Sequence, residues 1–102
     1  MEIKLADDSV EEFIGSLEKQ TIARVLHTID LLETFGNKLG MPHSKMIQKD
    51  LFELRIRGKQ EVRILYTFSK RNAVLLFGFV KKTEKTPRRY IELALLKTKQ
   101  LD

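Results

Sequence analysis

A series of basic residues in the second half of the chain offers the clearest chemistry in this sequence. Residues 51–89 contain eleven Lys or Arg residues and three acidic ones, whereas residues 1–50 contain six and nine. Clustered cations of this kind favour a polyanionic partner, either a nucleic acid or an acidic protein. The residues that we expect to bind or act on such a partner are Arg55, Arg57, Arg63, Lys81, Lys82, Lys85, Arg88, Arg89 and Tyr90.

These residue types could support cleavage of RNA by its own 2′-hydroxyl group. The reaction needs a base for the 2′ proton, a cationic site that holds the phosphate as charge builds, and an acid for the 5′ oxygen. Arginine supplies bidentate phosphate donors, and a lysine among other cations gives up its proton more readily and could act as the base. Such a site would be slow unless something else oriented the RNA.

Other kinds of site find little support in the sequence. The chain has no Cys, and its two histidines, His27 and His43, are isolated and are interpreted as surface residues. The sequence contains no G-x-x-x-x-G-K, G-x-S-x-G or H-E-x-x-H motif. We therefore expect neither a metal nor a cofactor.

Three strand-like runs position the basic residues. Apolar and charged side chains alternate over 52–56 and again over 62–68, and residues 73–80 are apolar on both faces apart from Gly78. Short polar turns at 58–60 and 69–72 join the runs, which predicts an antiparallel meander with the third run at the centre of the sheet.

Strand alternation predicts that Arg55, Arg57 and Arg63 share one face of this meander. Cross-strand neighbours on a face lie about 5 Å apart, so these guanidinium groups would repel unless an anion lay between them. The alternative is a solvated face on which Glu53 and Glu61 relieve the repulsion. Three arginines that end beside a lysine run favour an anion site.

The same alternation separates two further pairs of candidates. Lys81 and Lys82 are adjacent, so only one of them can join the arginine cluster, and we prefer Lys82. Tyr66 has the parity of the apolar face and is predicted to be core. For Tyr90, beside Arg88 and Arg89, both core packing and stacking on a base remain open.

The N-terminal half of the chain contains a predicted short strand over 2–5 and two predicted helices. Helical periodicity predicts the first helix over about 9–19, which begins with a capping box of Ser9 and Glu12. A second helix runs from Thr21 to Phe35 and ends at Gly36. The stripe that would face the sheet is Ile22, Val25, Leu26, Ile29 and Leu32, with Phe35 at its end.

The rest of the chain adds a long connection after the second helix and a last helix. Residues 36–50 are rich in helix and strand breakers, with a helical turn over 44–49. Thr86-Pro87 begins a last helix that runs to about Lys99, with Thr86 as the cap and Pro87 at the first helical position. The prediction is one α+β domain over 1–102: two N-terminal helices packed on a small, mainly antiparallel sheet, with a C-terminal helix.

Length and composition bound the class of protein. A chain of 102 residues with 42% apolar residues suits a single domain with a modest core. No run approaches 18 apolar residues, and the N-terminus shows no signal-peptide pattern. We expect a cytoplasmic protein without a membrane partner.

The order of these motifs resembles one known superfamily. The series L-x-E-L-R at 51–55, R-I-L-Y at 63–66 and G-F-x-K-K-T-x-K-T-P at 78–87 is similar to the RelE/HigB toxins of bacterial type II toxin–antitoxin modules. The match is closest to the HigB-like, phage-derived branch and covers nearly the whole chain.

The resemblance implies a RelE-like fold and ribosome-dependent cleavage of messenger RNA in the decoding site. It implies a cognate antitoxin, often HigA-like with a helix-turn-helix domain. It also implies a phosphate-binding role for Arg63 and catalytic roles for Arg55 and Lys82, and Tyr90 corresponds to a C-terminal tyrosine of some relatives. Histidine and aspartate catalytic residues of other relatives have no clear counterpart.

Two other functions remain open at this point. A ParE-like toxin would share the fold and block DNA gyrase by binding, although the basic sheet face argues against it. An RNA-binding relic would bind RNA without cutting it, with an affinity that falls steeply as salt rises.

Overall fold

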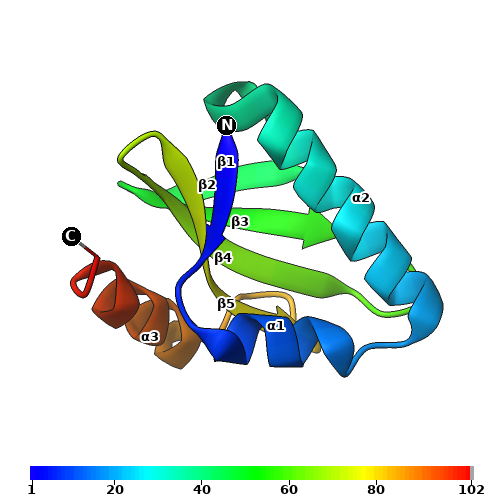
Figure 1. Ribbon diagram of the computed structural model, residues 1–102. Coiled ribbons are helices and arrows are strands. Elements are labelled where there is room, and N and C mark those ends of the chain that lie inside the picture. Colours follow the sequence, from blue (N-terminus) through cyan, green and yellow to red (C-terminus); the bar gives the residue numbers. More distant parts are fainter. Residues whose placement is uncertain (102) are drawn as a thin grey trace.

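Residues 1–101 of the computed structural model form a five-stranded sheet and three α-helices (Figure 1). The elements are β1 (Glu2–Leu5), α1 (Asp8–Gly15), α2 (Lys19–Phe35), a 3-10 turn η1 (Gly36–Lys38), β2 (Ser44–Gln48), β3 (Leu51–Ile56), β4 (Val62–Ser69), β5 (Asn72–Val80) and α3 (Arg88–Thr98). The predicted α+β class is confirmed. Within the described part of the chain, no helix is both long and apolar enough to cross a membrane.

The sheet has the strand order β1-β5-β4-β3-β2. Strand β1 pairs with β5 in parallel, and every other pair is antiparallel. The predicted meander of β3, β4 and β5 is confirmed, but the middle strand is β4 rather than β5. β5 nevertheless has strands on both sides and helices over both faces, which explains its continuous apolar sequence.

Helices α1 and α2 cover one face of the sheet, as predicted (Figure 1). Val25 and Leu32 of α2 pack there with Leu54 and Ile64, and all four are fully buried. Burying one side chain of this size contributes about 1.5–3 kcal/mol.

The buried stripe of α2 differs from the predicted one. It consists of Thr21, Val25, Thr28 and Leu32, whereas Leu26 and Phe35 are about half exposed. Thr28 can lie there because its hydroxyl donates a 2.9 Å hydrogen bond to the backbone oxygen of Arg24.

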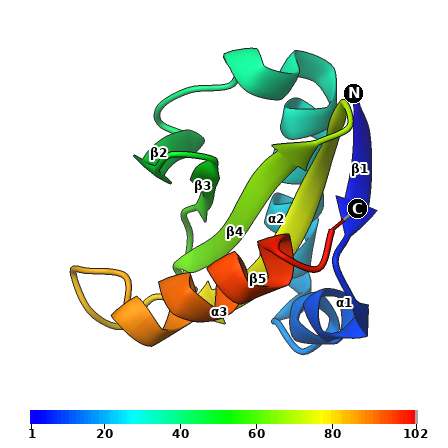
Figure 2. The same cartoon turned by 90° about the vertical axis from the view of Figure 1, so that its left-hand side faces the viewer.

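Helix α3 lies across the opposite face of the sheet (Figure 2). Ala94 of α3 is fully buried and belongs to a second core cluster with Leu51, Leu65 and Leu76. The cationic face that the sequence predicts is therefore only part of this side of the sheet. An apolar cluster fills the part of that face under α3, and the arginines occupy only the part that α3 leaves uncovered.

A bulge in β5 decides which side chains meet α3. Leu65 pairs with Phe77 but Tyr66 pairs with Leu75, so Leu76 is an extra residue in the ladder. One extra residue reverses the side-chain parity of everything that follows. Phe77 and Phe79 consequently pack in the cluster under α3, against Tyr90.

The helix ends differ from those expected of the sequence. The cap of α1 is Asp7, whose carboxylate accepts from the N–H of Ser9 at 3.0 Å, so the capping box of Ser9 and Glu12 is not formed. α1 ends at Gly15, and α2 begins at Lys19. Gly36 ends α2 as predicted, with a φ of 55° that favours glycine.

The prediction of a helical turn over 44–49 is wrong, because strand β2 occupies this segment. Its residues Lys45 and Met46 pair with Glu53 and Phe52 of β3. Lysine, methionine and glutamine are good helix formers, so local propensity favours a helix here. Pairing with the free edge of β3 overrides that preference.

Candidate nucleic-acid interface

Arg55 and Arg63 are direct cross-strand partners on β3 and β4. The Nε atoms of both lie near one oxygen of Glu53, at 3.8 Å for Arg55 and 3.5 Å for Arg63. Glu53 stands two residues before Arg55 and therefore shares its face of the strand. The anion between the two guanidinium groups is thus a carboxylate of the protein, which is the alternative that the sequence left open.

Arg63 is the most deeply placed member of this group. Its side chain is 1% exposed, and its guanidinium donates to the backbone oxygen of Val62 at 3.0 Å and to Glu61 at 3.4 Å. Burial alone would raise the pKa of Glu61, but the Gly58 N–H hydrogen bond and the charge of Arg63 together lower it below its ordinary value. Arg63 therefore holds Glu53 and Glu61 in place from within the protein, and truncating its side chain should destabilise the fold.

Thr86 connects this group to the segment before α3. Its hydroxyl donates a 2.6 Å hydrogen bond to Glu53. The prediction that Thr86 caps α3 is wrong, because the residue before the helix is Pro87 and no side chain caps the first turn. The hydroxyl binds a buried carboxylate instead and ties the end of the 81–87 loop, which projects beside the start of α3 (Figure 2), to β3.

A cleft of about 320 Å³ opens beside these residues, and we name it the Arg55 cleft. Its lining is Lys45, Met46, Ile47, Glu53, Arg55, Lys81, Glu84, Lys85, Thr86 and Ile91. Arg55 is 13% exposed there, and its Nε is buried without a hydrogen-bond partner within residues 1–101. That nitrogen is buried and faces Glu53, so the cleft offers an anion only the exposed part of the Arg55 side chain and its positive charge.

A second cleft, of about 440 Å³, lies at the start of α3, and we name it the Tyr90 cleft. Its lining is Phe79, Val80, Lys81, Lys82, Thr83, Pro87, Arg89 and Tyr90. The Arg89 guanidinium lies 4.8 Å from the centre of the Tyr90 ring and donates to its hydroxyl at 3.3 Å. The ring is held by Phe77 and Phe79, at 4.9 and 4.7 Å between ring centres.

Lys81 lines both the Arg55 cleft and the Tyr90 cleft. Lys82, the preferred lysine of the sequence, lines only the Tyr90 cleft and is exposed. The lysine that joins the arginine cluster is therefore Lys81. Strand alternation requires that only one of the two neighbours joins it, but which one depends on where β5 ends.

The other candidate residues lie at different places. Lys85 lines the Arg55 cleft, as described above. Arg88 lines neither cleft, because its guanidinium is almost fully exposed and pairs with Glu92 at 3.4 Å. Arg57 lies in a third groove on the α2 side, which also holds His27 and His43.

Two kinds of site residue are not apparent from the sequence. Lys45 reaches the Arg55 cleft only because residues 44–48 form an edge strand. The sequence presents His27 and His43 as isolated surface residues, yet α2 and the loop before β2 bring them to one groove. No local pattern connects two histidines sixteen positions apart, so only the tertiary structure could pair them.

The two clefts together offer binding groups for a phosphodiester. Arg55 and Arg89 provide planar donors, Lys81 and Lys82 provide ammonium groups, and Tyr90 provides a hydroxyl and an aromatic edge. Among residues 1–101, no group of three or more His, Cys, Asp or Glu residues is arranged to hold a metal ion.

This arrangement defines a small α+β domain with a basic, aromatic-lined surface at one end of its sheet. The model of the family "Phage derived protein Gp49-like (DUF891)" matches residues 12–99, and the chain belongs to this family. It is a family of RelE/ParE-like toxins, associated with toxin–antitoxin modules. A search of curated proteins by sequence found no match.

Proposed function

We propose that this protein is a HigB-like toxin of a type II toxin–antitoxin module that cleaves messenger RNA on the ribosome. The observation that carries the proposal is the position of Lys81 between the Arg55–Glu53 pair and the Arg89–Tyr90 pair. An RNA strand across Lys81 would meet phosphate donors on both sides and an aromatic ring for one base.

The proposed reaction is transesterification within the RNA. The 2′-oxygen attacks the adjacent phosphorus and the bond to the 5′-oxygen breaks, which leaves a 2′,3′-cyclic phosphate and a 5′-hydroxyl end. Lys81 or Lys82 removes the 2′ proton, and Tyr90 or the other lysine returns a proton to the 5′ oxygen. Arg55 and Arg89 stabilise the charge that builds on the phosphate.

Buried neighbours would act on this reaction through Arg55. Glu53 holds Arg55 beside the cleft, and Arg63 holds Glu53 from below. We therefore propose Arg63 and Glu53 as positioning residues. Lys85 is proposed as a further RNA contact at the rim of the Arg55 cleft, and Arg88 as a contact outside both clefts.

Membership of a toxin family supports the remaining features of the proposal. We propose a RelE-like fold, a cytoplasmic location and a cognate antitoxin with a helix-turn-helix domain. The partner is tested by expressing the toxin with and without the neighbouring gene of the module. We expect the toxin alone to arrest growth and the neighbouring gene to relieve the arrest. Expression alone at normal yield without growth arrest would contradict it.

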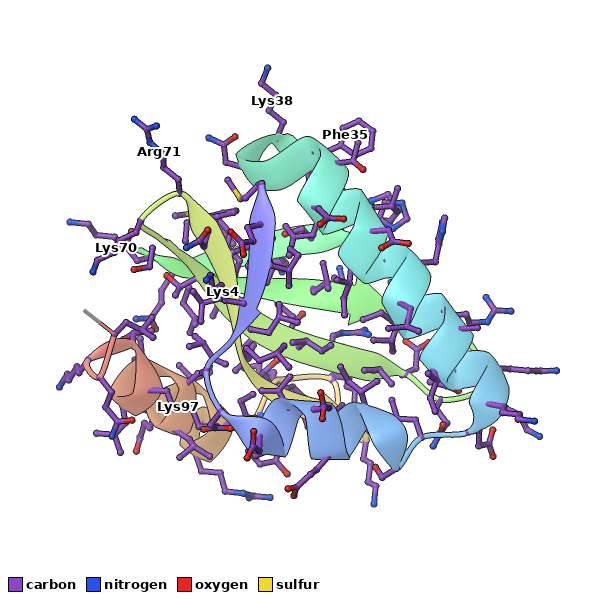
Figure 3. All side chains as sticks on the ribbon, in the orientation of Figure 1. Lys4, Phe35, Lys38, Lys70, Arg71 and Lys97 are labelled. Carbon is purple, nitrogen blue, oxygen red and sulfur yellow. The ribbon has the colours of Figure 1, made fainter. Side chains whose placement is uncertain are left out.

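The deciding experiment is primer extension on a messenger bound to ribosomes, with a ribosome-free control. We expect cuts only with ribosomes, their loss in Lys81→Met, and their retention in Lys38→Gln. Lys38 is a matched control because its side chain projects from η1 into solvent (Figure 3). Supercoiling inhibition without cuts would instead identify a gyrase-binding toxin, and salt-sensitive RNA binding without cuts would identify a non-catalytic relic.

A further inference from the structure

A third groove lies between α2 and the end of β3, and we name it the histidine groove. It has a volume of about 450 Å³ and is lined by Ala23, Arg24, His27, Thr28, Pro42, His43, Arg55, Ile56 and Arg57. Strand β3 extends past the beginning of β2 here, and its end approaches α2 (Figure 1).

The polar lining of the histidine groove is cationic or neutral. Three arginines, two imidazoles and one threonine contribute to it, and none of these lining residues is acidic. The Arg24 side chain lies over the turn after β3, since a Cβ atom on Gly58 would stand 3.1 Å from its Cδ. That contact keeps the Arg24 charge at the same end of the groove as Arg57.

The histidine groove is connected to the proposed reaction site through one residue. Arg55 lines both the histidine groove and the Arg55 cleft, just as Lys81 lines both the Arg55 cleft and the Tyr90 cleft. The three hollows therefore form a consecutive series in which each neighbouring pair shares a cation. A series of hollows linked by shared cations suits a chain of phosphates better than a single compact anion.

We propose that the histidine groove binds a backbone phosphate of the same single RNA strand, beyond the phosphate held in the Arg55 cleft. The inference rests on the proposed function for the identity of the strand. Arg24 and Arg57 bind the phosphate oxygens, and His27 and His43 donate hydrogen bonds from their imidazole N–H groups. The groove thereby sets how many nucleotides the protein holds on one side of the cut.

Fluorescence anisotropy with two ribonucleotide probes, a trinucleotide and a decanucleotide of uridine, tests this proposal. The groove variant is Arg24→Gln/His27→Gln, with Arg24→Gln alone beside it, and Lys38→Gln is the matched loss of one charge. We expect the double variant to bind the decanucleotide about tenfold more weakly, with a salt slope smaller by about 0.7, as for one lost phosphate contact. Trinucleotide binding stays within about twofold of the wild type.

Several outcomes would overturn the proposal. One is an equal loss for both probes, and another is a decanucleotide affinity equal to that of Lys38→Gln. A wild-type protein that holds the two probes equally well would also overturn it. So would a groove variant that loses poly-glutamate binding but keeps RNA binding, because the groove would then hold an acidic protein segment. Binding is measured without ribosomes, so a failure of cleavage alone contradicts the proposed function and leaves this inference standing.

Discussion

Arg55 and Arg63 face each other across β3 and β4 and share one oxygen of Glu53. The two guanidinium groups differ sharply in access, because Arg63 is buried while Arg55 reaches the surface of two hollows. A buried carboxylate shared by two arginines offsets part of their charge, and one of the two still lines the Arg55 cleft. This difference between two neighbouring arginines underlies the first prediction.

Replacing Glu53 with Gln should destabilise the protein by about 3 kcal/mol, because it leaves two poorly solvated guanidinium groups without their shared counter-charge. Urea denaturation monitored by circular dichroism measures the change. Glu92→Gln breaks the exposed pair with Arg88 and should cost less than about 0.5 kcal/mol. Equal effects of the two substitutions would show that Glu53 has no special role.

Lys81 and Lys82 should differ in their importance for cleavage. Lys81→Met should reduce the single-turnover rate on ribosome-bound messenger by about 100-fold or more, as for loss of a proton-transfer group. Lys82→Met should have a smaller effect, because Lys82 lines only the Tyr90 cleft. A larger loss of rate in Lys82→Met than in Lys81→Met would contradict this and would assign the main catalytic role to Lys82, as the sequence predicted.

Gly78→Ala should destabilise the fold by about 1–3 kcal/mol through overpacking. A Cβ atom at this position would lie 2.4 Å from the ring of Phe13, so either this ring or helix α1 would have to shift. Gly40→Ala is the control, since a Cβ atom on Gly40 would meet nothing within 4 Å. If thermal unfolding of the two variants is the same, the contact between Gly78 and Phe13 is not limiting.

Asp7 should contribute to stability in a pH-dependent way. Its pKa is lowered by the hydroxyl of Ser9 and then by Lys97, which lies 3.0 Å away and connects α3 to α1 (Figure 3). A lowered pKa in the folded state gives stability that is present above the unfolded value of 3.8 and is lost as the pH falls through the folded value.

Asp7→Ala should therefore cost about 1 kcal/mol at neutral pH, as for loss of a helix cap. The difference from the wild type should shrink as the pH falls below 3.8. Urea midpoints measured across the acid range test this expectation. A difference that stays constant with pH would mean that the charge of Asp7 contributes nothing.

Periodicity alone determined most of the elements. Alternation over β3 and β4 predicted which side chains of each strand are buried, including Tyr66. Successive side chains of a strand point to opposite faces, so the apolar ones must all lie on one face. The same reasoning placed Arg55 and Arg63 opposite the helices α1 and α2. These patterns are local, so they can be read from the sequence without knowledge of tertiary contacts.

Only the tertiary structure decided which cations line the clefts. The bulge at Leu76, the conversion of residues 44–48 into an edge strand and the position of α3 over the sheet all depend on contacts between distant segments. Those contacts bury Arg63, leave Arg55 partly accessible and bring Lys81 rather than Lys82 to the Arg55 cleft. Charge count and parity are properties of a segment, whereas burial and pairing are properties of the packed chain. The sequence therefore determined the basic region, and the fold determined which of its residues line the clefts.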